Sequence, residues 1–175
     1  MTTPKLARDP ARIEHAPVSN SAVPPSISVI VPTYKEAENI PALLDRLDRL
    51  RRAHHLELEL LIMDDDSRDG TDQIVAARGY DWVTLVVRRD DPGLSQAVCD
   101  GLSRARHQVL VVMDGDLSHP PETILDLVAA VANGYDFALG SRYVDGGSTA
   151  DNWGFFRWIN SRVATLLARP FTRVK

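Results

Sequence analysis

Asp114-Gly115-Asp116 has the residue types and spacing that most clearly predict chemistry in this 175-residue chain. Residues i and i+2 of an extended chain point the same way, so both carboxylates can face one hard cation while the glycine lets a ligand approach the backbone. Mg²⁺ or Mn²⁺ favours such oxygen ligands and would share them with a diphosphate. A turn whose aspartates cap the following helix would look the same, and the motif alone leaves both interpretations open.

A second acidic cluster, Asp64-Asp65-Asp66, begins the segment DDDSRDGT. Asp69-Gly70-Thr71, in the same segment, has the composition of a turn followed by a helix start. Asp64 stands directly after an apolar run, where it is better placed to accept hydrogen bonds from a nucleotide base. From these residues alone, turn chemistry is the favoured interpretation of the cluster.

Two further segments contain residues suited to a nucleotide. Pro32-Thr33-Tyr34-Lys35-Glu36 offers an aromatic ring and a carboxylate that could stack on a base and read its edge, or could pack and cap a helix. Gly93-Leu94-Ser95 precedes a predicted helix whose N-terminus could meet a phosphate. An ordinary loop has the same composition.

Basic residues are concentrated at the end of the chain. Residues 140–175 carry six Lys or Arg and two Asp, a net charge of +4, against −8 for everything before them. Trp153, Arg157 and Ser161 are four apart and share a helical face, and Arg142 precedes them. Arginines can hold phosphate oxygens bidentately, and with the nearby aromatics such a helix could rest at a bilayer interface. A core-packing helix with a solvated basic face is the alternative.

The elements that must position these residues alternate along the chain. Buried strands are predicted at residues 28–31, 58–63, 82–87, 109–113 and 137–139, and amphipathic helices at 40–50, 71–77, 94–105 and 120–131. This alternation predicts an α/β fold with a mostly parallel sheet and helices on both faces. Ligands of such sheets bind beyond the carboxyl ends of the strands, where both acidic clusters fall.

Length and composition predict the domain organisation. Residues 1–25 are polar and interrupted by prolines, which predicts a flexible arm, and residues 26–175 have the length of one domain. No apolar run approaches the ~20 residues of a membrane span, and the first residues lack the apolar block of a secretory signal. We therefore expect a cytoplasmic protein. Cys99 has no cysteine partner for a disulfide or a metal site.

Taken together, the motifs resemble glycosyltransferase family 2 of the GT-A (Rossmann-like) fold, and within it the dolichol/polyprenyl-phosphate mannose synthases. The resemblance covers about residues 27–170 and is carried by the order and spacing of VIVPTYKE, IMDDDSRDGT, GLSQAVCDG, VVMDGDLSHPPE, GSRY and W-x3-R-x3-S-R. It implies metal-dependent, inverting transfer of a sugar, usually mannose from GDP-mannose, to a polyprenyl or dolichyl phosphate. The protein would then contact the cytoplasmic membrane face peripherally.

The resemblance also implies roles for individual residues. The nucleotide-sugar site would consist of Pro32, Tyr34, Glu36, Asp64, Asp114, Gly115 and Asp116. The Mg²⁺ or Mn²⁺ ligands would be Asp114, Asp116 and Ser118, and the phosphate and acceptor site would be Arg142, Arg157 and Ser161. Asp116 and Arg142 would act at the reacting groups. A phosphate acceptor is already anionic, so no strong protein base is needed.

Two departures from the family pattern affect these expectations. Family members often have GLG where Gly93-Leu94-Ser95 stands here, which is a small change. The family also continues beyond Lys175, so we expect a C-terminally short chain in which donor binding can survive while transfer fails.

Other classes of protein share parts of the pattern. A strand ending in DGDLS also resembles haloacid-dehalogenase-type phosphatases, but their later lysine and acidic pair are missing, since Lys175 is the only lysine after Asp116. A receiver-like regulatory domain would have an acidic pair where Pro32 stands and a lysine where Arg142 stands. A non-catalytic nucleotide-sugar binder and a glucosyl or aminoarabinosyl transferase stay open as alternatives.

Overall fold

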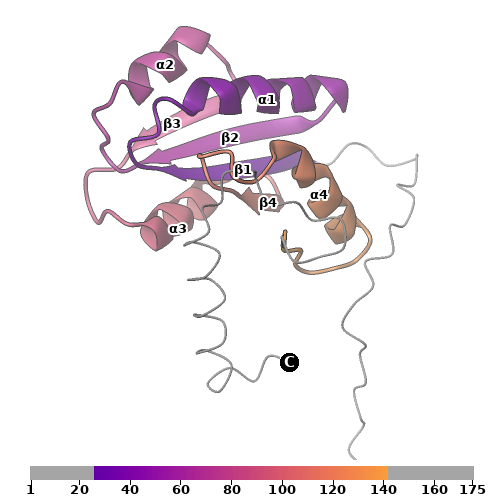
Figure 1. Ribbon diagram of the computed structural model, residues 1–175. Coiled ribbons are helices and arrows are strands. Elements are labelled where there is room, and N and C mark those ends of the chain that lie inside the picture. Colours follow the sequence, from indigo (N-terminus) through magenta and orange to yellow (C-terminus); the bar gives the residue numbers. More distant parts are fainter. Residues whose placement is uncertain (1–25, 142–175) are drawn as a thin grey trace, which may run out of the picture.

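The computed structural model describes residues 26–141, which form a parallel sheet with helices on both faces (Figure 1). Four strands, β1 (Ser26–Thr33), β2 (Glu57–Asp64), β3 (Val83–Val87) and β4 (Val109–Val112), pair in the order β3-β2-β1-β4. Every pairing is parallel, so the carboxyl ends of all four strands meet at one edge of the sheet. The central strands β1 and β2 are buried along almost their whole length.

Pro32 lies inside β1, although the sequence predicted that the strand stops before it. The Ile30 carbonyl accepts a hydrogen bond from the Met113 amide on the β4 side at 3.1 Å, and residues two apart in a strand direct their backbone groups to the same side. The β1–β4 pairing ends at Ile30 and Val112. The missing N–H of Pro32 therefore faces beyond the last pair, where it removes no ladder hydrogen bond.

The two faces of the sheet are covered by different helices (Figure 1). One face carries α1 (Ile40–Ala53), α2 (Thr71–Arg78), the short 3₁₀ helix η1 (Pro121–Thr123) and α4 (Ile124–Ala132), and the other carries α3 (Leu94–Arg104). The larger core lies under α1, whose buried side chains recur at helical spacing. The smaller core lies under α3 and joins Ile30, Leu61, Met63 and Ala97.

Helix α3 rests on the sheet with its backbone close to two core side chains. A Cβ added at Gly101 would lie 2.4 Å from Ile30 Cγ2 and 3.1 Å from Met63 Cγ. Carbon atoms in favourable contact are about 3.5–4.0 Å apart, so there is no room for a side chain. The glycine therefore sets how closely α3 approaches β1 and β2.

The predicted α/β fold class is confirmed, together with four of its five predicted strands. The fifth strand, predicted at residues 137–139, is wrong, because this segment pairs with no strand of the described sheet and Phe137 and Leu139 are exposed. Three apolar residues make a strand only where a neighbouring strand takes up their backbone groups.

Some sequence-based predictions fall outside the part of the chain that the structure describes. These are the arm at residues 1–25 and the phosphate and acceptor residues Arg142, Arg157 and Ser161. Among residues 26–141, no helix combines the length and the apolar character that crossing a bilayer requires.

Candidate functional site

The loops that follow the four strands gather at the carboxyl edge of the sheet. Each contains at least one non-glycine residue with positive φ: Lys35 at 59° after β1, Asp66 at 49° after β2, Asp91 at 51° after β3 and Leu117 at 58° after β4. Such backbone strain persists only where surrounding contacts hold it, and it clusters at ligand sites. This edge is therefore the candidate functional site.

Asp114 and Asp116 both expose their side chains at this edge, directly after β4. Asp116 Oδ1 accepts a hydrogen bond from the Ser118 amide at 2.9 Å, and Asp114 Oδ2 lies 3.8 Å from Nδ1 of His119. Neither aspartate caps the next helix, since η1 and α4 both begin without a side-chain cap. The helix-cap interpretation of the motif is therefore wrong, although Asp116 does close a turn within its own loop.

Gly115 is buried between the two aspartates and packs against the end of β1. A Cβ added there would lie 3.3 Å from Thr33 Cγ2, 3.4 Å from Val31 Cγ1 and 3.9 Å from Glu36 Cγ. The glycine thus brings the loop after β4 against the loop after β1. Its predicted contact with a ligand stays a prediction, because close packing already accounts for the residue.

The side chains after β4 have the chemistry that a hard divalent cation requires. Asp114, Asp116 and Ser118 offer oxygen donors. His119, which the sequence analysis did not single out, adds a nitrogen, and its Nδ1 lies 3.4 Å from Ser118 Oγ. Within residues 26–141, no three His, Cys, Asp or Glu side chains are grouped closely enough to hold a metal by themselves. A cation here would need further oxygens, and a bound diphosphate has such oxygens.

Asp64 is buried at the end of β2 and its carboxylate is bonded within the protein. Oδ1 accepts hydrogen bonds from the hydroxyls of Thr33, at 3.2 Å, and Ser67, while Oδ2 accepts one from the Ser67 amide at 2.9 Å. A carboxylate has about four lone-pair sites, so one more hydrogen bond is possible. The observed role of Asp64 is to shape the loop after β2, and its predicted contact with a base stays a prediction.

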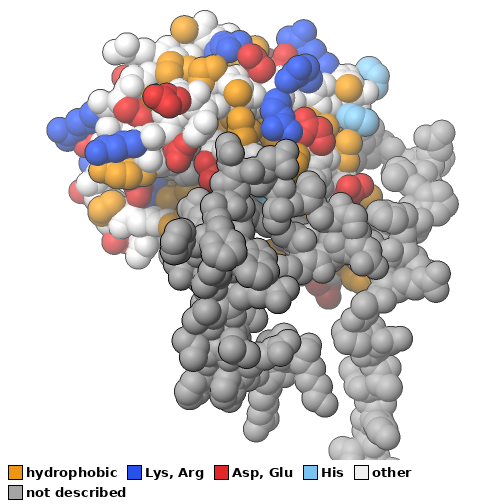
Figure 2. Space-filling model, viewed as in Figure 1, with side chains coloured by type: hydrophobic (Ala, Val, Ile, Leu, Met, Phe, Trp, Pro, Cys, Tyr) orange, Lys and Arg blue, Asp and Glu red, His pale blue; other side chains and the backbone are white. Residues whose placement is uncertain are grey.

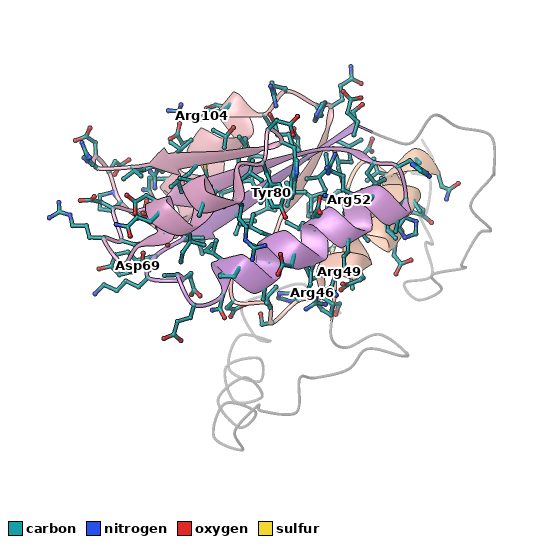
Figure 3. The ribbon with its side chains drawn as sticks, turned by 90° about the horizontal axis from the view of Figure 1, so that it is seen from above. Arg46, Arg49, Arg52, Asp69, Tyr80 and Arg104 are labelled. Atoms are coloured by element: carbon teal, nitrogen blue, oxygen red, sulfur yellow. The ribbon has the colours of Figure 1, made fainter. Side chains whose placement is uncertain are left out.

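The loops after β1 and β2 are joined by hydrogen bonds. The Lys35 amide donates to Ser67 Oγ at 2.8 Å, and the Ala37 amide donates to Asp69 Oδ2 at 3.0 Å. Asp69, at the carboxyl edge in Figure 3, also accepts from the amide and hydroxyl of Thr71, which is the predicted turn chemistry. Burial raises the pKa of Asp69, but these hydrogen bonds outweigh it and hold the pKa below its usual value.

Tyr34 and Glu36 stand close together in the β1–α1 loop but have different surroundings. Tyr34 is exposed, so its ring can be reached by a ligand, and Lys35 Nζ lies over the ring at 5.2 Å from its centroid. The Glu36 side chain accepts a hydrogen bond from Asn39, and its carbonyl accepts one from the Ile40 amide at 3.2 Å. Glu36 therefore shapes the start of α1, although α1 begins without a side-chain cap.

Arg88, which the sequence analysis missed, is buried at the end of β3. Its Nη1 donates to Asp65 Oδ1, its Nη2 donates to the Asp91 carbonyl at 2.9 Å, and its Nε lies 3.5 Å from Asp100 Oδ2. Asp65 Oδ2 also accepts from the Gly93 amide at 2.7 Å. One guanidinium thus ties the loops after β2 and β3 to α3. An arginine directly after an apolar strand was the signal in the sequence.

Two hollows flank the carboxyl edge. One, of about 330 Å³, lies beside Asp64 and is lined by charged side chains of both signs, among them Asp66, Arg68 and Arg89. A hydrogen bond from Arg68 holds the pKa of Asp66 below its usual value. The other, of about 460 Å³, lies between β3 and α3, away from Asp114. Figure 2 shows acidic and basic side chains intermingled on the described surface that it presents.

The fold has a counterpart among solved structures. The crystal structure of mannosyl-3-phosphoglycerate synthase from Rubrobacter xylanophilus matches with a TM-score of 0.53 and 22% sequence identity, over 61% of this chain and 36% of that one. At this identity the likeness concerns the fold alone, and it agrees with the predicted GT-A fold.

The sequence defines the family. A profile of glycosyl transferase family 2 matches residues 28–172, and the chain belongs to this family. A dolichol-phosphate mannosyltransferase of Pyrococcus furiosus is 43% identical over 144 residues, which are 82% of this chain and 40% of that protein. A polyprenol monophosphomannose synthase of Mycolicibacterium smegmatis is 39% identical over 149 residues, 81% of this chain and 54% of that protein. The chain spans about half the length of these relatives.

Proposed function

We propose that this chain is a metal-dependent, inverting glycosyltransferase that moves mannose from GDP-mannose to a polyprenyl or dolichyl phosphate. The observation that carries the proposal is the identity of 43% and 39%, over more than four fifths of the chain, to a dolichol-phosphate mannosyltransferase and a polyprenol monophosphomannose synthase. The exposed Asp114 and Asp116, at the edge where four loops converge, support it.

The nucleoside would lie over the loops after β1 and β2. The exposed ring of Tyr34 can stack on a base, and one lone pair of Asp64 is left to accept a hydrogen bond from the base edge. Pro32 and Glu36 shape the loop that carries Tyr34. These residues bind and orient the donor, and they take no part in bond breaking.

The diphosphate would lie over the loop after β4. Asp114, Asp116 and Ser118 are the residues that would hold Mg²⁺ or Mn²⁺ there. The bound metal would neutralise charge on the departing nucleoside diphosphate and act as a Lewis acid. Asp116 would thereby act closest to the reacting groups on the donor side.

The acceptor side of the proposal depends on residues beyond the described part of the chain. Arg142, Arg157 and Ser161 would hold the phosphates of donor and acceptor close together against their repulsion. Arg142 would act at the reacting groups, and the anionic acceptor would attack without a strong protein base. We further propose that the protein works in the cytoplasm, at the membrane face that presents the lipid phosphate.

A second candidate function is donor binding without transfer. It is favoured by one observation, that the candidate residues within the described part of the chain, Tyr34, Asp64, Asp114 and Asp116, are all ones that the proposal assigns to the donor. A glucosyl or aminoarabinosyl donor in place of mannose is the other alternative, because the contacts described above recognise a nucleotide more than a sugar.

A panel of labelled sugar nucleotides, incubated with the chain and a short polyprenyl phosphate, tests the proposal. We expect a mannosylated lipid that requires Mn²⁺ or Mg²⁺ and disappears with a chelator. Metal-dependent binding of GDP-mannose without product would favour the donor-binding alternative. Product formed from another sugar nucleotide instead would show that the transferred sugar is not mannose.

Asp116→Ala tests the site itself by calorimetry of GDP-mannose binding with Mn²⁺. We expect donor affinity to fall at least about tenfold, because a metal ligand is lost. Asp81→Ala is the matched control, since Asp81 is also exposed but lies before β3, at the opposite edge of the sheet. Equal donor affinity in the two variants would show that the metal site lies elsewhere.

A further inference from the structure

Ser28 on β1 and Glu59 on β2 form a buried polar pair on the face of the sheet under α3. The two residues are directly opposite in the β1–β2 register, and both are almost fully buried. Ser28 Oγ donates to Glu59 Oε1 at 2.7 Å. Neighbouring positions on this face, Ile30 and Leu61, are apolar and belong to the core under α3. A polar pair at such a place needs a reason, because burying a carboxylate is costly unless it is bonded.

The pair accepts two successive backbone amides from the segment that joins α3 to β4. The Arg106 amide donates to Glu59 Oε1 at 2.8 Å, and the His107 amide donates to Ser28 Oγ at 3.1 Å. The Arg106 guanidinium also donates to Glu59 Oε2. Two side chains of the central strands thus bind the backbone three and two residues before Val109, where β4 begins.

The sequence of β4 says little about its own register. Its four residues, VLVV, are all apolar, so no alternation of apolar and polar side chains marks the face that belongs to the core. A slip of one residue would turn Asp114 and Asp116 to the opposite face, and a slip of two would move them by about 6.6 Å along the sheet. Something other than the pattern must therefore specify where β4 stops.

Contacts at both ends of β4 can set its register. At the carboxyl end, Gly115 packs against Thr33. At the amino end, Arg106 and His107 donate hydrogen bonds to Glu59 and Ser28. Ser28 and Thr33 are roughly 16 Å apart along β1, at about 3.3 Å per residue. The pair can therefore affect the aspartates only through the position of the strand.

We propose that Ser28 and Glu59 are positioning residues that set the register of β4 and so place Asp114 and Asp116 at the carboxyl edge. The claim that the register of β4 affects ligand binding rests on the proposed function. The claim that Ser28 and Glu59 set the register does not, and it can be measured on the protein without a ligand.

The test compares Ser28→Ala and Glu59→Gln with a matched pair of controls. Ser26 and Glu57 form the same Ser–Glu pair two residues earlier in the same register, with Ser26 Oγ donating to Glu57 Oε2 at 2.7 Å, but they are more exposed. Ser26→Ala and Glu57→Gln therefore remove a similar cross-strand bond without touching the segment before β4.

Two measurements by nuclear magnetic resonance report on β4 directly. We expect amide hydrogen exchange in β4 to accelerate at least about tenfold in Ser28→Ala, while exchange in β2 stays within about twofold of the wild type. The cross-strand contact between Val29 and Val111, which are paired in register, should weaken. The controls should match the wild type. Uniformly faster exchange in all strands, or an unchanged β4, would overturn the proposal.

Binding of GDP-mannose with Mn²⁺ is the functional measurement on the same variants. We expect affinity to fall at least about fivefold in Ser28→Ala and less in Glu59→Gln, which keeps an oxygen for the Arg106 amide. Unchanged affinity with a displaced β4 would overturn the link to Asp114 and Asp116. Absence of binding in the wild type would contradict the proposed function. The magnetic resonance measurements on β4 would then still decide whether Ser28 and Glu59 set its register.

Discussion

At the scale of single residues, the aspartates of the carboxyl edge divide by how deeply their carboxylates are buried. Asp64 and Asp65 are largely buried and accept hydrogen bonds from neighbouring loops, whereas Asp114 and Asp116 expose their side chains. A carboxylate that is bonded on several sides holds its surroundings in place. The first two aspartates are therefore expected to govern stability, and the second two to govern ligand binding.

Replacing Asp65 with asparagine removes the negative charge opposite the buried guanidinium of Arg88. We expect the free energy of unfolding to fall by about 1–3 kcal/mol, because Arg88 loses a charged hydrogen-bond partner inside the protein. Arg88 keeps its contact with the Asp91 carbonyl, which limits the loss. Urea unfolding followed by circular dichroism measures the difference.

Asp90→Asn is the control for this prediction, because Asp90 is exposed two residues after Arg88. Its effect on the free energy of unfolding should stay within about 0.5 kcal/mol of zero, as for most surface substitutions. If the two variants unfold at the same urea concentration, the Asp65–Arg88 pair contributes nothing net to stability.

At the scale of elements, α3 is held against the sheet at two points. Gly101 lets its backbone lie on Ile30 and Met63, and the Ser28–Glu59 pair binds the segment that follows the helix. The distance between α3 and the sheet therefore depends on one missing side chain. Pattern analysis identified α3 as amphipathic, but the close contact at Gly101 is a property of two elements together.

Gly101→Ala is expected to overpack the core under α3. The added methyl group would overlap Ile30, so we expect a loss of about 1–3 kcal/mol in the free energy of unfolding, despite the better helix propensity of alanine. Thermal and urea unfolding both measure this change.

Ser103→Ala, on the exposed side of the same helix, is the control. A stabilised Gly101→Ala would mean that α3 can move away from the sheet at little cost, and the close contact would then not be required.

At the scale of the whole molecule, the carboxylates bonded in the folded protein link its stability to pH. Burial alone raises the pKa of Glu59, but hydrogen bonds from Arg106 and Ser28, together with the Arg106 charge, outweigh it and hold the pKa below the usual 4.5. A group whose pKa is lower in the folded state contributes stability above its unfolded pKa. That contribution is lost as the pH falls through the folded value.

We therefore expect the stability difference between the wild type and Glu59→Gln to depend on pH. The wild type should be more stable above about pH 4.5, and the difference should shrink as the pH is lowered further, because both forms then have a neutral side chain at this position. Urea unfolding from pH 7 to pH 3 measures it. A difference that stays constant to pH 3 would mean that the charge of Glu59 is not what stabilises the cluster.

The sequence by itself determined the class of fold and the edge of the sheet at which the candidate site lies. Periods of apolar residues are local properties, and the alternation of strand-like and helix-like runs leaves few arrangements other than a covered parallel sheet. Acidic residues directly after two apolar runs then had to meet at one edge. Asp114 and Asp116 were identified on that basis, and their exposure agrees with it.

Only the tertiary structure decided which of the acidic residues after the strands are exposed and which are buried among hydrogen-bond donors. Asp64 and Asp114 both follow buried strands, yet Thr33 and Ser67 enclose the first and nothing comparable encloses the second among the described contacts. The apolar segment at residues 137–139 likewise makes no strand, because strands need partners. Hydrogen bonds and close packing between distant segments depend on three-dimensional placement, which no local pattern contains.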